Sequence, residues 1–357
     1  RRRRQMCIRD RHYTIPALLI KPTQAMTGDS MSAIYLPILA LIAGILGLLW
    51  GADRFVTGSA GAARNFGVSP MVIGLTLVSV GTSAPEIIVS INAALSNVGE
   101  MAVGNALGSN LANIGLVLGI TALIAPLPVQ KHLLKEESPV LLLITALAGL
   151  CLYNGFLGRG ESISLALLVI PLLVLIVKYK KSNPNPEALE EAEDIPELTM
   201  ATAGLWFVIG LAVLLISARV TVWGAQSIAV YMGISELVIG LTVVAIGTSL
   251  PELAASVISA MRGHHDIALG NVFGSNLFNL MLVMTSAGAI SPMALNAQVF
   301  SRDFAAMCFM TLLMIALVAL ALRQNPQRAR LSRTMGLLLL AGYGFYYVLL
   351  WPAIAAG

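Results

Sequence analysis

The sequence predicts an all-α integral membrane protein with ten transmembrane helices, arranged as two five-helix repeats of inverted topology. Three observations lead to this fold class. The 357 residues are 57% hydrophobic and only 11% charged, and the mean hydropathy is +0.83. Apolar runs long enough to cross about 30 Å of hydrocarbon recur along the chain. A passage of the first half also returns in the second half, which indicates that the chain arose by duplication.

The duplicated passage covers residues 67–113 and recurs without a gap at 233–279. The first copy contains GVSPMVIGLTLVSVGTSAPE and GNALGSNLAN, and the second contains GISELVIGLTVVAIGTSLPE and GNVFGSNLFN. The shared residues are mostly Gly, Ser, Thr, Asn, Pro and Glu, which supply oxygen ligands and helix breaks. Packing alone would preserve hydrophobicity instead. The repeat therefore predicts one polar site that is built twice.

Apolar runs between charged or Gly/Pro breaks give ten candidate spans. In chain order they are 33–55, 69–95, 101–124, 138–154, 162–178, 202–229, 236–261, 267–289, 303–322 and 335–352. The polar, Pro-containing and acidic stretch 179–200 is the predicted linker between a first repeat, 32–178, and a second repeat, 201–357. Because each half has an odd number of spans, the second half enters the membrane from the opposite side and the repeats are inverted.

Residues 1–31 stand apart from these spans. They have neither the apolar run of a signal peptide nor a helical period, and Met31 is a better start. The string MCIRDR looks like a translated sequencing adapter. We therefore expect a non-native or disordered leader; a basic tail on the membrane surface is the alternative.

The distribution of Lys and Arg between alternate loops predicts the orientation. If the chain starts outside, the outer loops hold only Arg159 and Arg302. The inner loops then hold Arg64, Lys131, Lys135, Lys178, Lys180, Lys181, Arg262, Arg323, Arg328, Arg330 and Arg333. We therefore expect a multi-pass protein of the cell's inner (plasma) membrane, with both termini outside and the 179–200 linker in the cytoplasm.

The composition disfavours several other functions. The net charge of +4 is scattered between spans rather than gathered in a patch, so no nucleic-acid partner is expected. His132, His264 and His265 lie near loop ends without a nucleophile or metal-ligand spacing, so we expect neither an enzyme nor a cofactor. The turn around His264 and Asp266 is expected to be a solvated loop rather than a pH sensor. No protein partner is evident besides the lipid bilayer.

Glu86 and Glu252 lie well inside predicted spans. An unpaired carboxylate at the bilayer centre costs at least about 2.5 kcal/mol. Neither glutamate has a basic residue within one or two helical turns, so the compensating charge is a proton or a bound cation. A neutral glutamate that hydrogen-bonds a neighbouring helix is the alternative, which two glutamates in matched settings disfavour.

Further oxygen-bearing groups accompany each glutamate on one helical face. The two stripes are Ser79, Thr82, Ser83 and Glu86, and Ala245, Thr248, Ser249 and Glu252. Pro85 and Pro251 lack an N–H, so the carbonyl group four residues before each loses its helical partner and is free to bind a cation. An ordinary proline kink that serves packing is the alternative.

The span after each glutamate adds a second polar stripe at four-residue spacing. The two copies are Asn105, Ser109 and Asn113, and Asn271, Ser275 and Asn279. Such side chains also join membrane helices to one another, and the glycine pairs Gly104/Gly108 and Gly270/Gly274 predict close helix packing. Together, the carboxylates, hydroxyls, amides and carbonyls make an all-oxygen site, which suits hard cations such as calcium or sodium.

These motifs resemble the calcium/cation antiporter (CaCA) superfamily, whose sodium/calcium exchangers carry two inverted alpha repeats with GTSxPE in the second and seventh helices. The resemblance covers nearly all of residues 32–357 and is greatest to the prokaryotic sodium/calcium exchangers. It implies the ten-helix sodium/calcium exchanger fold. It also implies a calcium site formed by Glu86, Glu252, the carbonyl oxygens of Thr82 and Thr248, and the central Asn113 and Asn279.

The same resemblance implies sodium sites on both sides of the calcium site. Their residues are Ser79, Ser83 and Ser109 in one half, and the Ala245 carbonyl, Ser249 and Ser275 in the other. Some members, particularly potassium-dependent and some archaeal forms, have an acidic residue at the position of Asn113 or Asn279. Both positions are neutral here, which argues against potassium dependence and leaves two negative charges at the centre.

The predicted function is secondary active antiport of calcium against sodium by alternating access, with both ions as transported substrates. One calcium ion neutralises both glutamates and sodium ions do the same, but the site cannot hold both loads. The resemblance further implies that spans 33–55 and 202–229 slide as gates across a rigid core. A proton/calcium antiporter that uses the same glutamates is the alternative, although the paired serines favour sodium. Two inverted halves suit alternating access better than a channel.

Overall fold

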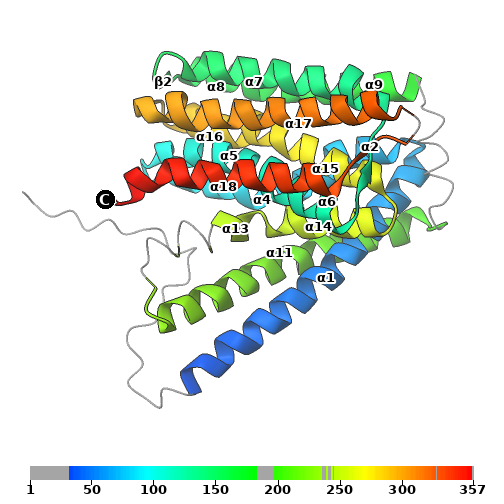
Figure 1. The fold of residues 1–357 in the computed structure, drawn as a ribbon, viewed down its shortest axis with the longest axis horizontal. Helices are drawn as coiled ribbons and strands as arrows, with labels where there is room; N and C mark the ends of the chain where they lie inside the picture. Colours follow the sequence, from blue (N-terminus) through cyan, green and yellow to red (C-terminus); the bar gives the residue numbers. More distant parts are fainter. Residues whose placement is uncertain are drawn as a thin grey trace, which may run out of the picture.

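The computed structural model describes residues 32–182, 197–234, 239, 243, 245–326 and 328–355. The predicted leader 1–31 and most of the predicted linker, 183–196, lie outside the described residues. The described chain is helical almost throughout, with two long helices, α1 and α11, along one side of a bundle (Figure 1).

The first half holds five helical segments. They are α1 (Ser32–Phe66); α2 (Pro70–Ile73), η1 (Gly74–Val78), α3 (Ser79–Thr82) and α4 (Ala84–Leu95); α5 (Gly99–Ala112), η2 (Asn113–Val117) and α6 (Leu118–Ile124); η3 (Leu133–Glu137) and α7 (Ser138–Leu152); and α8 (Arg159–Leu167) with α9 (Val169–Ser182). The segments labelled η are π-helical turns, in which one extra residue widens the helix locally. Each of the first five predicted spans overlaps one of these segments.

The second half repeats this order. Its elements are α11 (Met200–Tyr231); α13 (Ala245–Thr248) and α14 (Leu250–Met261); α15 (His265–Phe278), η5 (Asn279–Val283) and α16 (Met284–Ile290); η6 (Val299–Phe304) and α17 (Ala305–Gln324); and α18 (Arg333–Ala355). The predicted span 236–261 is described continuously only from residue 245. Within the described chain, seven segments are long and apolar enough to cross a membrane, and the bent pair Pro70–Thr82 and Ala84–Leu95 makes an eighth.

Two short antiparallel strand pairs join loops of the two halves. Strand β1 (Leu127–Pro128) pairs with β4 (Arg330–Leu331), and β2 (Phe156–Leu157) pairs with β3 (Met293–Ala294). Each pair links the region after a central helix of one half to the region beside an outer helix of the other. The two halves are therefore connected by strand pairing between their loops as well as by helix packing.

The centre of the bundle is formed by the helices that carry the second polar stripe. Of the 18 most apolar consecutive residues in His265–Ile290, 94% are buried, whereas the corresponding share in α1 is 22%. Gly270 explains part of this close fit, because a Cβ there would lie 2.7 Å from the Met71 carbonyl oxygen of α2. The predicted close approach is thus confirmed for Gly270 and Gly274. For Gly104 and Gly108 no neighbour lies within 4 Å in the described chain, and most of the symmetry-related segment falls outside it.

Helices α1 and α11 pack along one another through small residues. A Cβ at Gly51 would lie 2.6 Å from the Leu214 nitrogen, and one at Gly210 would lie 2.6 Å from the Phe55 Cα. The predicted end of the first span at residue 55 is too early, because α1 continues to Phe66. The additional turns are helical because their small residues, including Val56, Ser59, Ala60 and Ala63, are buried by tertiary contacts.

Candidate cation site

Both glutamates lie at breaks in a helix. Helix α3 ends at Thr82 and α4 begins at Ala84, and the two helices meet at an angle of 45°. Helices α13 and α14 are likewise separated at Ser249. Pro85 and Pro251 occupy the first turn of α4 and α14, where a backbone N–H has no helical acceptor in any case. The predicted interruption at each proline is therefore present.

This break places each carboxylate in a favourable backbone field. Glu86 and Glu252 lie in the first turn of α4 and α14, where helix N–H groups carry partial positive charge. The carbonyl groups at the end of α3 and α13 carry the opposite partial charge and have lost helical partners. One broken turn thus presents carbonyl oxygens that attract a cation directly beside a carboxylate.

The two carboxyl groups are buried with few partners. Glu86 and Glu252 are each 2% exposed, and their charges repel one another. Neither oxygen of Glu86 and only one of Glu252 has a hydrogen-bond partner in the described chain. That one, Glu252 Oε1, accepts a long hydrogen bond of 3.4 Å from the Ser83 hydroxyl. Because buried charge without a partner is costly, the arrangement favours a bound cation or a proton.

The second stripe contributes further unpartnered oxygens. Asn113 and Asn279 each begin a π-helical turn, η2 and η5. Both are buried, and the side-chain oxygens of Asn113, Asn279 and Ser275 have no hydrogen-bond partner among the described residues. Single π-helical turns are frequent at functional sites, since the extra residue redirects side chains. The sequence predicted the asparagines but not these turns, because one extra residue leaves the apolar pattern unchanged.

The other predicted ligands are also largely buried. Ser79, Thr82, Ser83, Ser109 and Ser249 are buried and Thr248 is half-buried. The Ala245 side chain lies outside the described part of the structure, but the predicted ligand there is its carbonyl group, at the start of α13. The predicted residues therefore come from helices that pack against one another at the centre of the bundle.

The two halves are directly linked at this site. The Thr82 hydroxyl donates to Asn271 Oδ1 at 3.2 Å, and the Asn271 amide donates to the Glu252 carbonyl oxygen at 3.3 Å and to Ser256 Oγ at 3.0 Å. Sequence reasoning placed Asn271 in a polar stripe but assigned it no role. The repeat does not indicate a role for Asn271 in particular, since Asn105 is the same residue type at the corresponding position of the first half.

A second polar cluster lies outside the predicted spans. His132 Nδ1 is 3.1 Å from Glu137 Oε2, and Lys180 Nζ lies 2.7 Å from Glu137 Oε1 and also pairs with Glu136. Side-chain atoms of His132, Glu136 and Glu137 are close enough to hold a metal ion, but the Lys180 ammonium already contacts all three residues. The cluster therefore already holds a cationic group, the Lys180 ammonium.

The same cluster corrects one expectation and perturbs one histidine. Asp266 is buried, with Oδ1 4.0 Å from His132 Nε2, so the expected solvated loop is wrong at this residue. Burial alone would lower the pKa of His132, but the hydrogen bond and the charge of Glu137, with the charge of Asp266, outweigh burial. The pKa of His132 is consequently raised above its usual 6.5.

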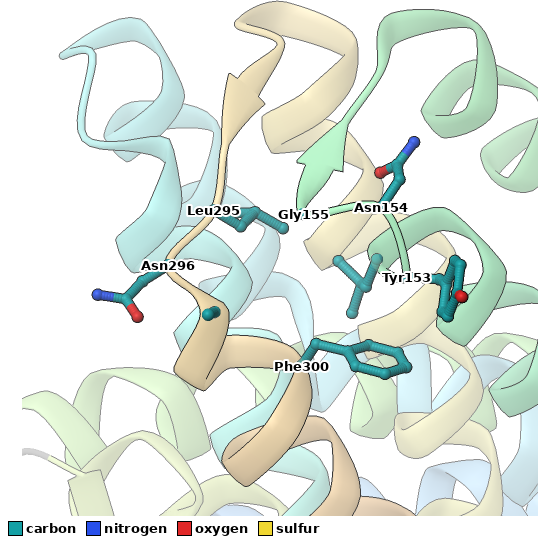
Figure 2. Close-up of a pocket in the computed structure, with 8 residues that line it drawn as sticks. Tyr153, Asn154, Gly155, Leu295, Asn296 and Phe300 are labelled. Atoms are coloured by element: carbon teal, nitrogen blue, oxygen red, sulfur yellow. The ribbon is translucent and has the colours of Figure 1, made fainter.

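One cavity of the described chain is lined by neither glutamate. A cavity of about 290 Å³ is lined by Tyr153, Asn154, Gly155, Leu295, Asn296, Phe300 and two neighbours, where β2 meets β3 (Figure 2). None of the predicted cation ligands lines it. It therefore adds nothing to the site formed by the broken helices.

Comparisons with known proteins show what the whole chain is similar to. The family model described as "Sodium/calcium exchanger protein" matches residues 36–178 and 202–351, one segment in each half. The putative antiporter CaxA of Alkalimonas amylolytica is 44% identical over 87% of this chain and 97% of its own length. The inner membrane protein YrbG of Escherichia coli is 38% identical over 87% of this chain and 95% of its own length.

A solved structure extends the likeness to three dimensions. The sodium-calcium exchanger NCX_Mj, soaked with zero Na⁺ and Ca²⁺, matches with a TM-score of 0.75 and 33% identity. The match covers 88% of this chain and 98% of that one. The predicted fold class, an all-α membrane protein of two inverted five-helix repeats, is confirmed.

Proposed function

The chain belongs to the sodium/calcium exchanger protein family, and from this premise we propose that it exchanges calcium for sodium. As a member of this family it is a multi-pass membrane antiporter for calcium and other cations rather than an enzyme. The exchange occurs by alternating access at the site of Glu86 and Glu252. One observation carries the proposal: two buried carboxylates at matched helix breaks have almost no hydrogen-bond partners in the described chain, and their charges repel one another. Such a pair requires cationic charge.

Charge competition gives the exchange its obligatory character. One calcium ion balances two carboxylates, and sodium ions in neighbouring positions balance the same charge. The two loads therefore exclude each other. When the site is empty, two buried negative charges resist movement through a low-dielectric path. Only loaded forms then alternate between the two sides, which is antiport rather than leak.

The residues near the carboxylates favour sodium over protons as the counter-ion. A proton needs only the carboxylates themselves, whereas sodium needs several further oxygen ligands. The buried hydroxyls of Ser79, Ser83 and Ser249 and the unpartnered Ser275 Oγ supply such ligands in both halves. We therefore place calcium centrally, with Thr82, Thr248, Asn113 and Asn279, and place sodium at the serines, Ser109 included, and at the Ala245 carbonyl.

We further propose that α1 and α11 are the moving pair. They pack on each other through glycine contacts and are much less buried than α15. The contact between α1 and the core includes the ion pair of Asp53 with Arg262, which must break if α1 slides. The charge distribution supports an orientation with both termini outside and the 179–200 linker cytoplasmic, in the inner membrane.

The counter-ion is tested by exchanging gradients in proteoliposomes that contain the full chain. Calcium-45 uptake is measured after an outward sodium gradient, an outward proton gradient, or neither is imposed. The proposal predicts uptake that requires the sodium gradient and persists when a protonophore collapses any pH difference. Uptake that follows the pH gradient and ignores sodium establishes the proton/calcium alternative.

A further inference from the structure

The two halves repeat most of the residues around each glutamate, but the Asn271 amide makes two hydrogen bonds where the amide of its counterpart Asn105 makes none in the described chain. Asn271 is completely buried on α15. Its Oδ1 accepts from Thr82 at the broken turn of the first half. Its amide donates to the main chain of Glu252 and to Ser256 on α14. One side chain therefore holds the beginning of α14 at two points and joins it to the Thr82 hydroxyl of the other half.

The amide of the symmetry-related Asn105 does not make the corresponding bonds. Asn105 Nδ2 is buried and has no hydrogen-bond partner in the described chain. Ser90, the counterpart of Ser256, instead donates to the Val283 carbonyl oxygen at 2.5 Å and lies 2.8 Å from Ser286 Oγ. The Ser90 hydroxyl is thus bonded to η5 and α16, and Asn105 Nδ2 makes no hydrogen bond with it.

The different hydrogen bonds of Ser90 and Ser256 accompany a residue difference between the two halves. Ser286 occupies the position that Ile120 occupies in the first half, and isoleucine offers no hydroxyl to hold Ser256. Ser256 therefore stays available to Asn271, while Ser90 is drawn away from Asn105. The asymmetry follows from a residue difference between the repeats.

We propose that Asn271 is a positioning residue that preforms the Glu252 half of the cation site, while the Glu86 half closes around the ion. The inference rests on the proposed function and goes beyond it by assigning unequal roles to the two glutamates. Asn271 holds the Glu252 main chain and the Thr82 hydroxyl, and the neighbouring Ser83 hydroxyl reaches the Glu252 carboxylate. In contrast, the Glu86 carboxylate has no such support among the described residues.

Preforming one half lowers the cost of ordering ligands when the ion binds, which raises affinity. A connected buried network is also rigid, since each bond strengthens its neighbours. Loss of Asn271 should therefore raise the calcium concentration for half-maximal uptake and leave the maximal rate largely unaffected. A residue that served packing alone would lower thermal stability without shifting the calcium dependence.

The test compares Asn271→Ala with the symmetry-matched Asn105→Ala in full-length protein. Sodium-driven calcium-45 uptake into proteoliposomes gives the half-maximal calcium concentration and the maximal rate. The calcium-induced rise in melting temperature gives binding without transport. We expect Asn271→Ala to raise the half-maximal concentration about tenfold, or about 1.4 kcal/mol, which corresponds to one or two net hydrogen bonds. The shift in Asn105→Ala should be clearly smaller.

A double-mutant cycle tests whether Asn271 acts through Thr82. Thr82→Val keeps the Thr82 carbonyl group but removes the hydroxyl, and Thr82→Ser restores a hydroxyl. Thr82→Val should raise the half-maximal calcium concentration as Asn271→Ala does, and the double variant should raise it no further than either single variant. Thr82→Ser should recover most of the calcium affinity. If Asn271→Ala fails to fold, Thr82→Val and Ser256→Ala decide the question.

Equal shifts in Asn271→Ala and Asn105→Ala, or effects of Thr82→Val and Asn271→Ala that multiply, overturn the proposal. The proposed function fails separately, if the unaltered protein shows no sodium-driven uptake. In that case the calcium-induced melting shift still compares the two asparagine variants. The two failures are therefore distinguishable.

Discussion

Replacing Glu86 with glutamine should stabilise the ion-free protein and abolish its response to calcium. Glu86 is 2% exposed and neither carboxylate oxygen has a hydrogen-bond partner in the described chain. Glutamine keeps the shape and removes both the buried charge and its repulsion with Glu252. The same change deletes one of two anionic ligands, so its effects with and without calcium have opposite signs.

The expected magnitudes follow from the burial of this charge. A charged side chain at membrane depth costs at least about 2.5 kcal/mol, and 1 kcal/mol shifts the melting temperature of a large domain by about 2 °C. Glu86→Gln should thus raise the ion-free melting temperature by roughly 5 °C. Calcium at a hundred times its dissociation constant stabilises the unaltered protein by about 2.7 kcal/mol. Removing one partner of a buried charge costs about 3 to 5 kcal/mol, so this stabilisation should disappear.

The assay is thermal unfolding of the purified protein in alkaline buffer, with a chelator or with calcium. Glu197→Gln is the matched control, because the Glu197 side chain is 85% exposed and pairs only at the surface with Arg64. The control should melt like the unaltered protein under both conditions. A lower ion-free melting temperature in Glu86→Gln, or a calcium shift that survives the substitution, refutes the reasoning.

Three further outcomes are expected. Gly210→Leu should stop transport and destabilise the protein, since its Cβ would lie 2.6 Å from the Phe55 Cα. The control Gly160→Ala should be harmless, because a Cβ there would have no neighbour within 4 Å in the described chain. Equal transport rates in the two variants would contradict the packing account. His132→Gln should destabilise the protein below the usual histidine pKa of 6.5 and progressively less as pH rises through the raised pKa of His132. Melting curves across this pH range check the sign, and a difference that grows with pH is the opposite result. Asn279→Asp should add a third negative charge and tighten calcium binding, measured as a larger calcium-induced melting shift; an unchanged shift places residue 279 away from the ion.

Much of the fold was predictable, because it depends on local pattern. Lengths of apolar sequence located every described span, and the prolines located the breaks at Ser83 and Ser249, since a missing N–H interrupts a helix wherever it occurs. The end of α1 was not predictable, because its final turns are stabilised by burial against other helices. Tertiary packing there overrides local composition.

For the candidate site too, the sequence predicted some features and could not predict others. The duplicated motifs identified which oxygens gather near Glu86 and Glu252, because a repeat preserves residue type. They could not reveal the π-helical turns at Asn113 and Asn279, which insert a residue without altering the pattern. Nor could they distinguish Asn271 from Asn105, since the difference arises from a contact between Ser90 and Ser286 on separate helices.

The most direct test of the central claim is calcium-45 uptake driven by an outward sodium gradient in the unaltered protein, Glu86→Gln, Glu252→Gln and the control Glu197→Gln. The account predicts gradient-dependent uptake in the unaltered and control proteins and none in either buried-glutamate variant. Uptake that survives in Glu86→Gln or Glu252→Gln would contradict a transport site built from the two matched carboxylates.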